Sequence, residues 1–113
     1  MAIQATGILL EGCVLALLAN EDAYGYSLTQ QVKKELGVSE STLYPVVRRL
    51  QTDGCLTTYD KPHNGRNRRY YRITNRGLVK YKECADAWEE FKMNVDAIIL
   101  NRKAEQVKEI EHE

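Results

Sequence analysis

Long apolar runs are missing from this sequence. No stretch approaches the roughly 20 apolar residues that a membrane-spanning helix needs. The first 12 residues, MAIQATGILLEG, lack a basic segment and place Glu11 inside their apolar part, which is not typical of a secretory signal peptide. We therefore expect a cytoplasmic protein without membrane association.

Clustered metal ligands are also missing. The cysteines, Cys13, Cys55 and Cys84, lie far apart without any C-x-x-C pair, and the histidines, His63 and His112, are isolated. Zinc sites need ligands at close, regular spacing, so no metal site is expected. The simplest interpretation is three reduced and mostly buried thiols. A redox-sensing thiol stays an alternative, although nothing in the sequence would lower a thiol pKa.

The sequence offers no catalytic constellation. It has no nucleophile–base pair, no two carboxylates on a common face and no phosphate-binding glycine loop. We therefore expect a protein that is not an enzyme and needs no cofactor.

An excess of one charge is missing as well, because 16 basic residues balance 16 acidic residues. Residues 48–80 nevertheless hold nine Lys and Arg against two Asp, so this segment carries a charge of +7 and the remainder −7. The plain interpretation is a solvated charged surface. Because the basic residues surround a turn and alternate with tyrosines, they favour a nucleic-acid-binding face on an acidic body.

Two short helices joined by a tight turn are predicted over residues 24–36 and 39–54. Apolar residues recur every three or four positions in each, Gly37 is suited to end the first, and Ser39 is suited to cap the second. Asp22 is a candidate cap for the first helix. The short connection matches a helix-turn-helix, although any helical hairpin gives a similar pattern.

Pro45 interrupts the second of these helices. Proline lacks a backbone donor and costs about 3 kcal/mol inside a regular helix. The sequence therefore predicts either a distorted first turn or a helix whose regular part begins only near Pro45.

A β-hairpin is predicted next. Residues 55–60 and 68–73 are the strands and residues 61–67 the turn, in which Asn64 and Gly65 give the strongest hairpin signal. A hairpin directly after a helix-turn-helix is the wing of a winged-helix domain, and its basic tip suits phosphates or the minor groove. Alternation along the return strand separates two groups of side chains onto opposite faces. They are Arg68, Tyr70 and Arg72 on one face and Arg69, Tyr71 and Ile73 on the other.

Helices that need a partner are expected at both ends of the chain. Residues 6–19 are apolar on nearly all sides, which in so small a protein suggests that a second chain covers part of them. A long helix is expected from residue 75 past residue 99, to residue 109 at the furthest. Its apolar residues recur in steps of three and four, as in a coiled-coil seam. They are Tyr81, Cys84, Trp88, Phe91, Val95 and Ile98.

The expected fold is therefore mainly α with a small β-hairpin. Residues 1–74 would form a winged helix-turn-helix DNA-binding domain with an N-terminal helix. Residues 75–113 would form a C-terminal dimerisation helix and a charged tail, and the two parts would make one compact unit.

Several short motifs also occur in a distinctive order across about residues 8–100. Their residues are Tyr24, Gly25, Tyr26, Leu43, Tyr44, Pro45, Arg49, Leu50, Asp53, Gly54, Gly65, Arg66, Arg69, Tyr70, Tyr71, Thr74 and Gly77. In this order and spacing they resemble the PadR family of bacterial winged-helix transcriptional regulators, in the short form of its multidrug-sensing members. Two positions depart from the usual pattern, with Gln51 for an acidic residue and Cys55 for an aliphatic one.

The resemblance implies a homodimer, formed by the first and last helices, that represses its own gene or a neighbouring transporter or stress-response gene. It also implies that Pro45 need not end its helix. Some short-form members hold planar hydrophobic effectors in an aromatic cavity at the dimer centre, where Trp88 would lie with Phe91 and Val95. The alternative is that Trp88 only packs in the interface.

DNA contact, at a pseudo-palindromic operator, is expected from the second helix of the helix-turn-helix and from the wing. The exposed front of the helix offers Ser41, Thr42, Tyr44 and Arg48. The wing offers Lys61, Arg66, Arg68 and Arg69. A hairpin neighbour is an alternative partner for Arg69, and Tyr70 and Tyr71 are expected to pack. The alternative function is a winged helix that binds an acidic protein partner and senses no small molecule.

Overall fold

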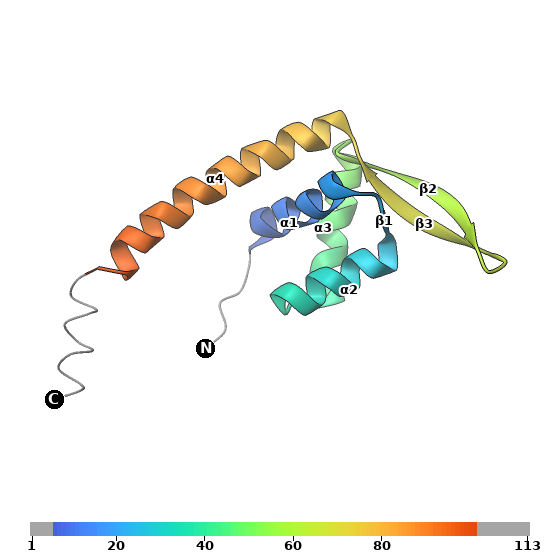
Figure 1. Cartoon of the computed structure of the whole chain (residues 1–113), viewed down its shortest axis with the longest axis horizontal. Coiled ribbons are helices and arrows are strands. Elements are labelled where there is room, and N and C mark those ends of the chain that lie inside the picture. The colour runs from blue at the N-terminus through green and yellow to red at the C-terminus, as the bar shows by residue number, and fades with distance from the viewer. Residues whose placement is uncertain (1–5, 102–113) are drawn as a thin grey trace.

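The structure, a computed structural model, describes residues 6–101 of the chain and has four helices and a three-stranded antiparallel sheet in that range (Figure 1). The elements are α1 (Gly7–Asn20), β1 (Ala23–Tyr24), α2 (Gly25–Leu36), α3 (Glu40–Thr52), β2 (Leu56–His63), β3 (Arg66–Ile73) and α4 (Asn75–Ile99). The expected fold, mainly α with a hairpin and a long last helix, is confirmed. The wing and α4 extend from the helical core in different directions (Figure 1).

The core forms around α1, which contacts α2, α3 and α4. Its apolar surface is broad enough to face three helices at once, which is why the helix reads as apolar on nearly all sides. The first turn remains open, since Ile8 is 69% exposed. The fully buried side chains come from all three of the first helices and the start of β2. They are Leu10, Val14, Leu15, Leu18, Leu28, Val32, Leu43, Leu50, Cys55 and Leu56.

The helix-turn-helix is formed by α2 and α3 as predicted. Gly37 ends α2 in the left-handed conformation, with φ of 66°. Ser39 caps α3, since its Oγ accepts a 3.2 Å hydrogen bond from the backbone N–H of Thr42. Pro45 lies inside a continuous helix that begins at Glu40, so the alternative start near Pro45 is wrong.

The prediction that Asp22 caps α2 is also wrong. A two-residue strand, β1, lies between Asp22 and the helix and pairs Ala23 with Tyr71 of β3 and Tyr24 with Tyr70. Helix α2 therefore begins at Gly25, one residue later than expected, and its N-cap makes no side-chain hydrogen bond. Asp22 instead binds side chains of the wing.

The wing is longer and its turn tighter than the sequence suggested. Residues Asn64 and Gly65 alone form the turn, with positive φ values of 52° and 78°, and His63 pairs directly with Arg66. Such a two-residue turn needs no further loop, so the expected turn over residues 61–67 is wrong at both ends. The strand order β1-β3-β2 leaves Pro62 on an edge strand, where its missing donor breaks no ladder.

Helix α4 begins beside the end of α3 and then leaves the core. The hydroxyl of Thr74 accepts from the N–H of Gly77 at 3.1 Å and donates to the carbonyl of Gly54 at 2.7 Å. A Cβ on Gly77 would lie 2.3 Å from the Cys55 carbonyl oxygen, so glycine allows this close approach. The 25-residue helix spans about 38 Å at 1.5 Å per residue. It ends at Ile99, so the expected continuation past residue 99 is wrong for Leu100 and Asn101, and the rest of the expected extension lies outside the described residues.

Within residues 6–101, no helix combines the length and the apolarity that crossing a membrane requires.

Candidate nucleic-acid interface

The exposed side of α3 carries all four predicted helix residues. Leu43, Val46, Val47 and Leu50 face the core, whereas Ser41, Thr42, Tyr44 and Arg48 are exposed. The Oγ of Ser39 lies 3.0 Å from Ser41 Oγ and 2.9 Å from Thr42 Oγ1. This hydroxyl cluster at the helix N-terminus can donate or accept hydrogen bonds, which suits base edges and phosphates alike.

One polar contact sets the position of α3 against α2. Gln30 Nε2 donates a 2.8 Å hydrogen bond to Glu40 Oε1 in the first turn of α3. The exposed front of α3 is therefore held from its N-terminal end by a neighbour on α2.

On one surface of the wing, tyrosine rings lie beside one another and basic side chains lie over them. We call this surface the tyrosine face. It comprises Tyr24, Tyr59, Tyr70, Lys61, Arg68 and Arg72. Tyr70 lies with its ring centroid 5.5 Å from that of Tyr59 and 5.9 Å from that of Tyr24. Arg68 covers the Tyr24 ring at 4.7 Å and Lys61 lies 5.7 Å from the Tyr70 centroid. Two predicted DNA-contact residues, Lys61 and Arg68, thus stabilise the wing itself.

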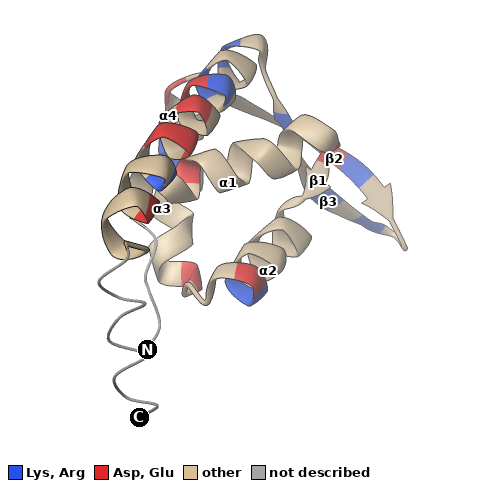
Figure 2. Cartoon of the chain, turned by 60° about the vertical axis from the view of Figure 1, so that its left-hand side comes forward, with Lys and Arg blue, Asp and Glu red and all other residues tan. Residues whose placement is uncertain are grey.

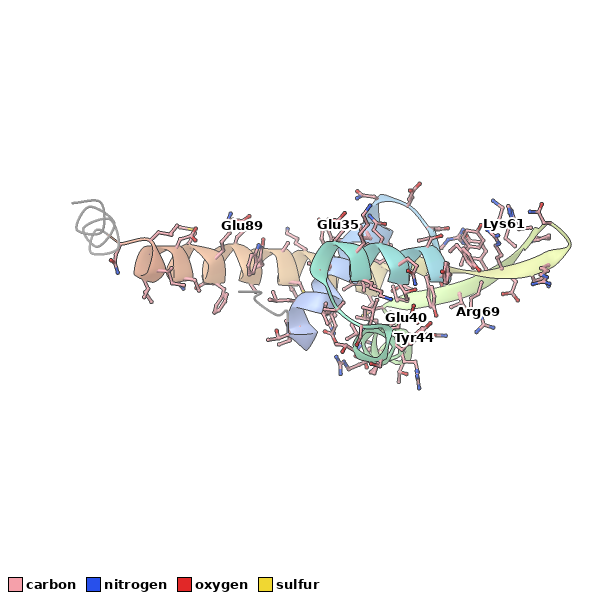
Figure 3. All side chains as sticks on the ribbon, turned by 90° about the horizontal axis from the view of Figure 1, so that it is seen from below. Glu35, Glu40, Tyr44, Lys61, Arg69 and Glu89 are labelled. Atoms are coloured by element: carbon pink, nitrogen blue, oxygen red, sulfur yellow. The ribbon has the colours of Figure 1, made fainter. Side chains whose placement is uncertain are left out.

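The opposite surface of the wing faces α3. Arg69 lies on the same side of the molecule as Tyr44, whereas Lys61 lies on the other side (Figure 3). Arg69 and Tyr44 line a shallow groove of about 250 Å³ with residues from β1, α2 and β3. The Nε of Arg69 is 3.8 Å from Asp60 Oδ1, a long and exposed pair that leaves the guanidinium accessible. The alternation predicted for β3 is therefore confirmed.

Arg66 and Arg48 are the least constrained of the predicted cations. Arg66 follows the tight turn at the wing tip and Arg48 lies on the front of α3, and both side chains are exposed. Neither forms an ion pair within the described part of the chain. The structure thus brings Arg48 and Arg69 to one surface with Ser41, Thr42 and Tyr44, and it places Arg66 at the wing tip.

Tyr26 is a candidate contact that sequence reasoning missed. It begins α2, is 61% exposed, and lines the groove beside Tyr44 and Arg69. In the sequence, Tyr26 follows Gly25 in a motif that resembles the PadR family. The motif was used only for that resemblance, and no DNA contact was predicted for Tyr26.

Two cations of the predicted basic face are instead bound to Glu11. Arg49 Nε donates to Glu11 Oε1 at 2.6 Å, and Lys80 Nζ lies 3.2 Å from Glu11 Oε2. Burial raises the pKa of Glu11, but these two partners outweigh burial and hold the pKa below its ordinary value. The remaining basic residues of this segment lie mostly on the wing, while acidic residues gather on α4 (Figure 2).

The predicted seam on α4 divides into two parts. Tyr81 and Cys84 are half-buried, and Cys84 packs beside Gly12 of α1. Further along, Trp88 is 43% and Phe91 59% exposed, with their ring centroids 6.4 Å apart. Beyond these rings, Val95 is half-buried and Ile98 exposed. The outer part of the seam thus presents apolar side chains that the chain's own core does not cover.

The thiols of the described residues show no sign of activation. Cys55 is buried, Cys13 and Cys84 are half-buried, and none forms a disulfide. Burial raises the pKa of both the Cys13 and the Cys84 thiol. The same part of the chain contains no group of three or more His, Cys, Asp and Glu side chains that could hold a metal ion.

Comparison with known proteins identifies the family. The sequence profile described as the Transcriptional regulator PadR-like family matches residues 14–83. The chain belongs to the PadR-like family of transcriptional regulators. The family predicted from the motifs is thus confirmed, and so is the expectation of a regulator that is not an enzyme.

Relatives of this PadR-like protein share its fold and much of its length. It is 36% identical over 83 residues to the transcriptional regulator Rv3488 of Mycobacterium tuberculosis, covering 73% of this chain and 78% of that protein. The structure of smu.1704 from Streptococcus mutans UA159 is similar with a TM-score of 0.82 and 35% identity, over 90% of this chain and 96% of the other. The structure of the PadR-like transcriptional regulator BC4206 from Bacillus cereus has a TM-score of 0.74 and 31% identity to this chain. The similarity covers 82% of this chain and 93% of the other.

Proposed function

We propose that this PadR-like protein is a homodimeric repressor that acts in the cytoplasm on its own gene or a neighbouring transporter or stress-response gene. Residues 1–74 would bind a pseudo-palindromic operator, and residues 75–113 would hold the dimer together. A small planar hydrophobic effector would release the operator. The main support for this proposal is the exposed apolar seam of α4. It occurs in a chain whose α3 has polar side chains on its solvent-facing side.

The dimer is supported by the outer seam. Trp88, Phe91 and Ile98 are 43%, 59% and 72% exposed, and they follow one another along one stripe of α4. A contiguous apolar stripe of this kind marks an interaction surface in a water-soluble domain. A second α4, related by a two-fold axis, offers the same stripe and would cover it.

In the DNA complex, α3 would enter the major groove. Ser41, Thr42, Tyr44 and Arg48 would meet base edges or nearby phosphates, and Arg66 and Arg69 would meet phosphates from the wing. Lys61 and Arg68 would contribute mainly to the field around the wing, because both already contact tyrosine rings. Two copies of α3 would dock in successive major grooves about 34 Å apart.

An effector site would form where the two copies of Trp88 meet. The flat indole rings, with Phe91 and Val95 beside them, would stack on a planar aromatic compound. Binding there would change the angle between the two α4 helices and shift the population away from the DNA-binding arrangement. If Trp88 only packs in the interface, no such compound will bind.

A DNA selection tests the proposed function. The wild-type protein is incubated with random duplexes, and the bound sequences are read and titrated against salt. We expect an inverted repeat whose binding weakens as salt rises, because phosphate contacts release counterions. Absence of any salt-sensitive DNA binding would contradict the proposal and favour the alternative, a winged helix that binds an acidic protein.

A further inference from the structure

A buried carboxylate joins three helices of the core. Glu11 on α1 is only 6% exposed, and both of its oxygens bind cations. One oxygen accepts from Arg49 in the last turn of α3, and the other lies beside Lys80 in the second turn of α4. Among residues 6–101, these are the only ion pairs that link one helix to another.

A glycine of α1 lets α4 approach closely beside the carboxylate. A Cβ on Gly12 would lie 3.2 Å from Cβ of Cys84, one turn beyond Lys80 on α4, which is a tight contact. On the other side of Glu11, a Cβ on Gly7 would lie 3.5 Å from Nη2 of Arg49, an ordinary contact, so the guanidinium passes over this position. The close approach that glycine allows is therefore the one between α1 and α4.

The Glu11 contacts complement a second connection between α3 and α4. Near the start of α4, Thr74 is bound to the Gly54 carbonyl just after α3. The backbone N–H of Thr74 also donates to the Cys55 carbonyl at 3.0 Å, so the end of α3 and the start of α4 are held together at this junction. The pairs through Glu11 lie further from the junction on both helices, where they restrict the angle between the helices.

Stability alone is a weak reason for such a network. Removing a carboxylate from water is costly, and well-packed apolar residues often stabilise a core as well as a buried ion pair does. A carboxylate held by two cations from two directions instead favours one arrangement of the three helices over others. Its structural effect is therefore orientation.

We infer that Glu11 is a positioning residue that fixes the direction of α3 relative to α4, and through α4 the separation of the two α3 helices in the dimer. This inference rests on the proposed function, because only a dimer that reads two half-sites has such a separation. Glu11 itself is buried behind α3 and touches no DNA. Its effect is on which operator spacing the dimer accepts.

The test uses half-sites selected by the wild-type protein and placed in inverted repeats whose centre-to-centre spacing varies by single base pairs. Glu11→Gln keeps the shape and an acceptor oxygen but loses the charge that holds both cations. Glu83→Gln, on an exposed part of α4, makes the same change in net charge and serves as the matched control. Binding to each duplex is measured by fluorescence anisotropy, and thermal unfolding verifies that each variant is folded.

The wild-type protein and Glu83→Gln should prefer one spacing by about tenfold over its neighbours, comparable to the effect of a mismatched base pair. Glu11→Gln should bind a single half-site as the wild type does, yet discriminate between spacings by less than about threefold. A uniform loss of affinity at every spacing, with the preference unchanged, would overturn the inference. A wild-type protein that binds no duplex, or shows no spacing preference, would overturn the proposed function first.

A second variant covers the case in which Glu11→Gln does not fold. Lys80→Met removes the α4 partner while Arg49 still neutralises the buried carboxylate, and Lys82→Met is its exposed control. Lys80 lies on α4, away from the front of α3, and its ion pair is with Glu11, so a change in Lys80→Met that Lys82→Met does not share is assigned to the loss of this pair. We expect the same loss of preference in Lys80→Met, and a wild-type spacing profile there would contradict the inference.

Discussion

The hydroxyl of Tyr59 donates a 2.8 Å hydrogen bond to Asp22 Oδ2, which ties the edge strand of the wing to the loop after α1. The same oxygen accepts a 3.0 Å hydrogen bond from Arg72 Nε, and the Arg72 guanidinium lies 4.6 Å from the Tyr59 ring. The bond to Asp22 raises the pKa of Tyr59, because it favours the neutral phenol. Asp22 therefore anchors one end of the tyrosine face.

Loss of this anchor should loosen the wing. We expect Asp22→Ala to lower the free energy of unfolding by on the order of 1 kcal/mol, the centre of the range measured for point mutations. Urea denaturation at neutral pH measures the effect. Glu21→Ala is the matched control, since Glu21 is an exposed neighbouring carboxylate with no ion pair in the described chain. Equal stability of the two variants would show that Asp22 does not hold the wing.

Arg66 and Arg68 should differ in their effect on DNA binding. Arg66 is free at the wing tip, so Arg66→Ala should weaken binding to all sequences and reduce the salt-dependence slope by about one unit. Arg68 covers the Tyr24 ring, so Arg68→Ala should change the slope less and lower protein stability more. Anisotropy titrations at several salt concentrations measure both slopes. A wild-type slope in Arg66→Ala would remove the wing tip from the interface.

The Glu11 network should make stability depend on acid pH. The pKa of Glu11 lies below its ordinary value of 4.5, because Arg49 and Lys80 outweigh the effect of burial. A carboxyl with a lowered pKa stabilises the fold above its unfolded-state pKa, and this contribution is lost as pH falls through the folded-state pKa. The stability difference between wild type and Glu11→Gln should therefore be largest near neutral pH and shrink below pH 4.5. Denaturant unfolding at several pH values measures it, and a constant difference would contradict the pKa direction.

The sole tryptophan reports on the proposed effector site. A planar aromatic compound stacked between two Trp88 rings should quench the protein's fluorescence. Trp88→Ala should weaken binding of a fluorescent planar dye by about two- to tenfold, the range that an aromatic pair contributes. If a broad panel of planar compounds leaves the emission unchanged, Trp88 packs in an interface and senses nothing of this kind.

Local patterns were sufficient to predict most elements of the fold. Ser39 and Gly37 mark helix ends through contacts within a few residues, and Asn64 with Gly65 forms a turn from its own backbone preferences. The order of the short motifs was sufficient to predict the family. The short strand β1 was missed because Tyr24 is defined as a strand residue only by its distant partner Tyr70.

The candidate site was harder to predict, because its charges depend on contacts between distant parts of the chain. Arg49 and Glu11 are 38 positions apart, so no local pattern shows that this arginine is already bound. Likewise, Arg68 contributes to the basic count of the wing, but its position over Tyr24 follows from the sheet order. The charge of each segment was sufficient to predict the basic region. It could not show which basic side chains already bind a carboxylate or lie over a tyrosine ring.

In the proposed complex, two chains joined along the α4 seam bind one operator. Sedimentation equilibrium of the wild-type protein with a duplex that it selects measures this stoichiometry. We expect two chains per duplex. Phe91→Asp, in the seam, should remain folded but sediment as a monomer with greatly reduced affinity for DNA. Met93→Asp, at an exposed position outside the seam, should behave as wild type. One wild-type chain per duplex, or no complex at low salt, would contradict the proposed dimeric complex.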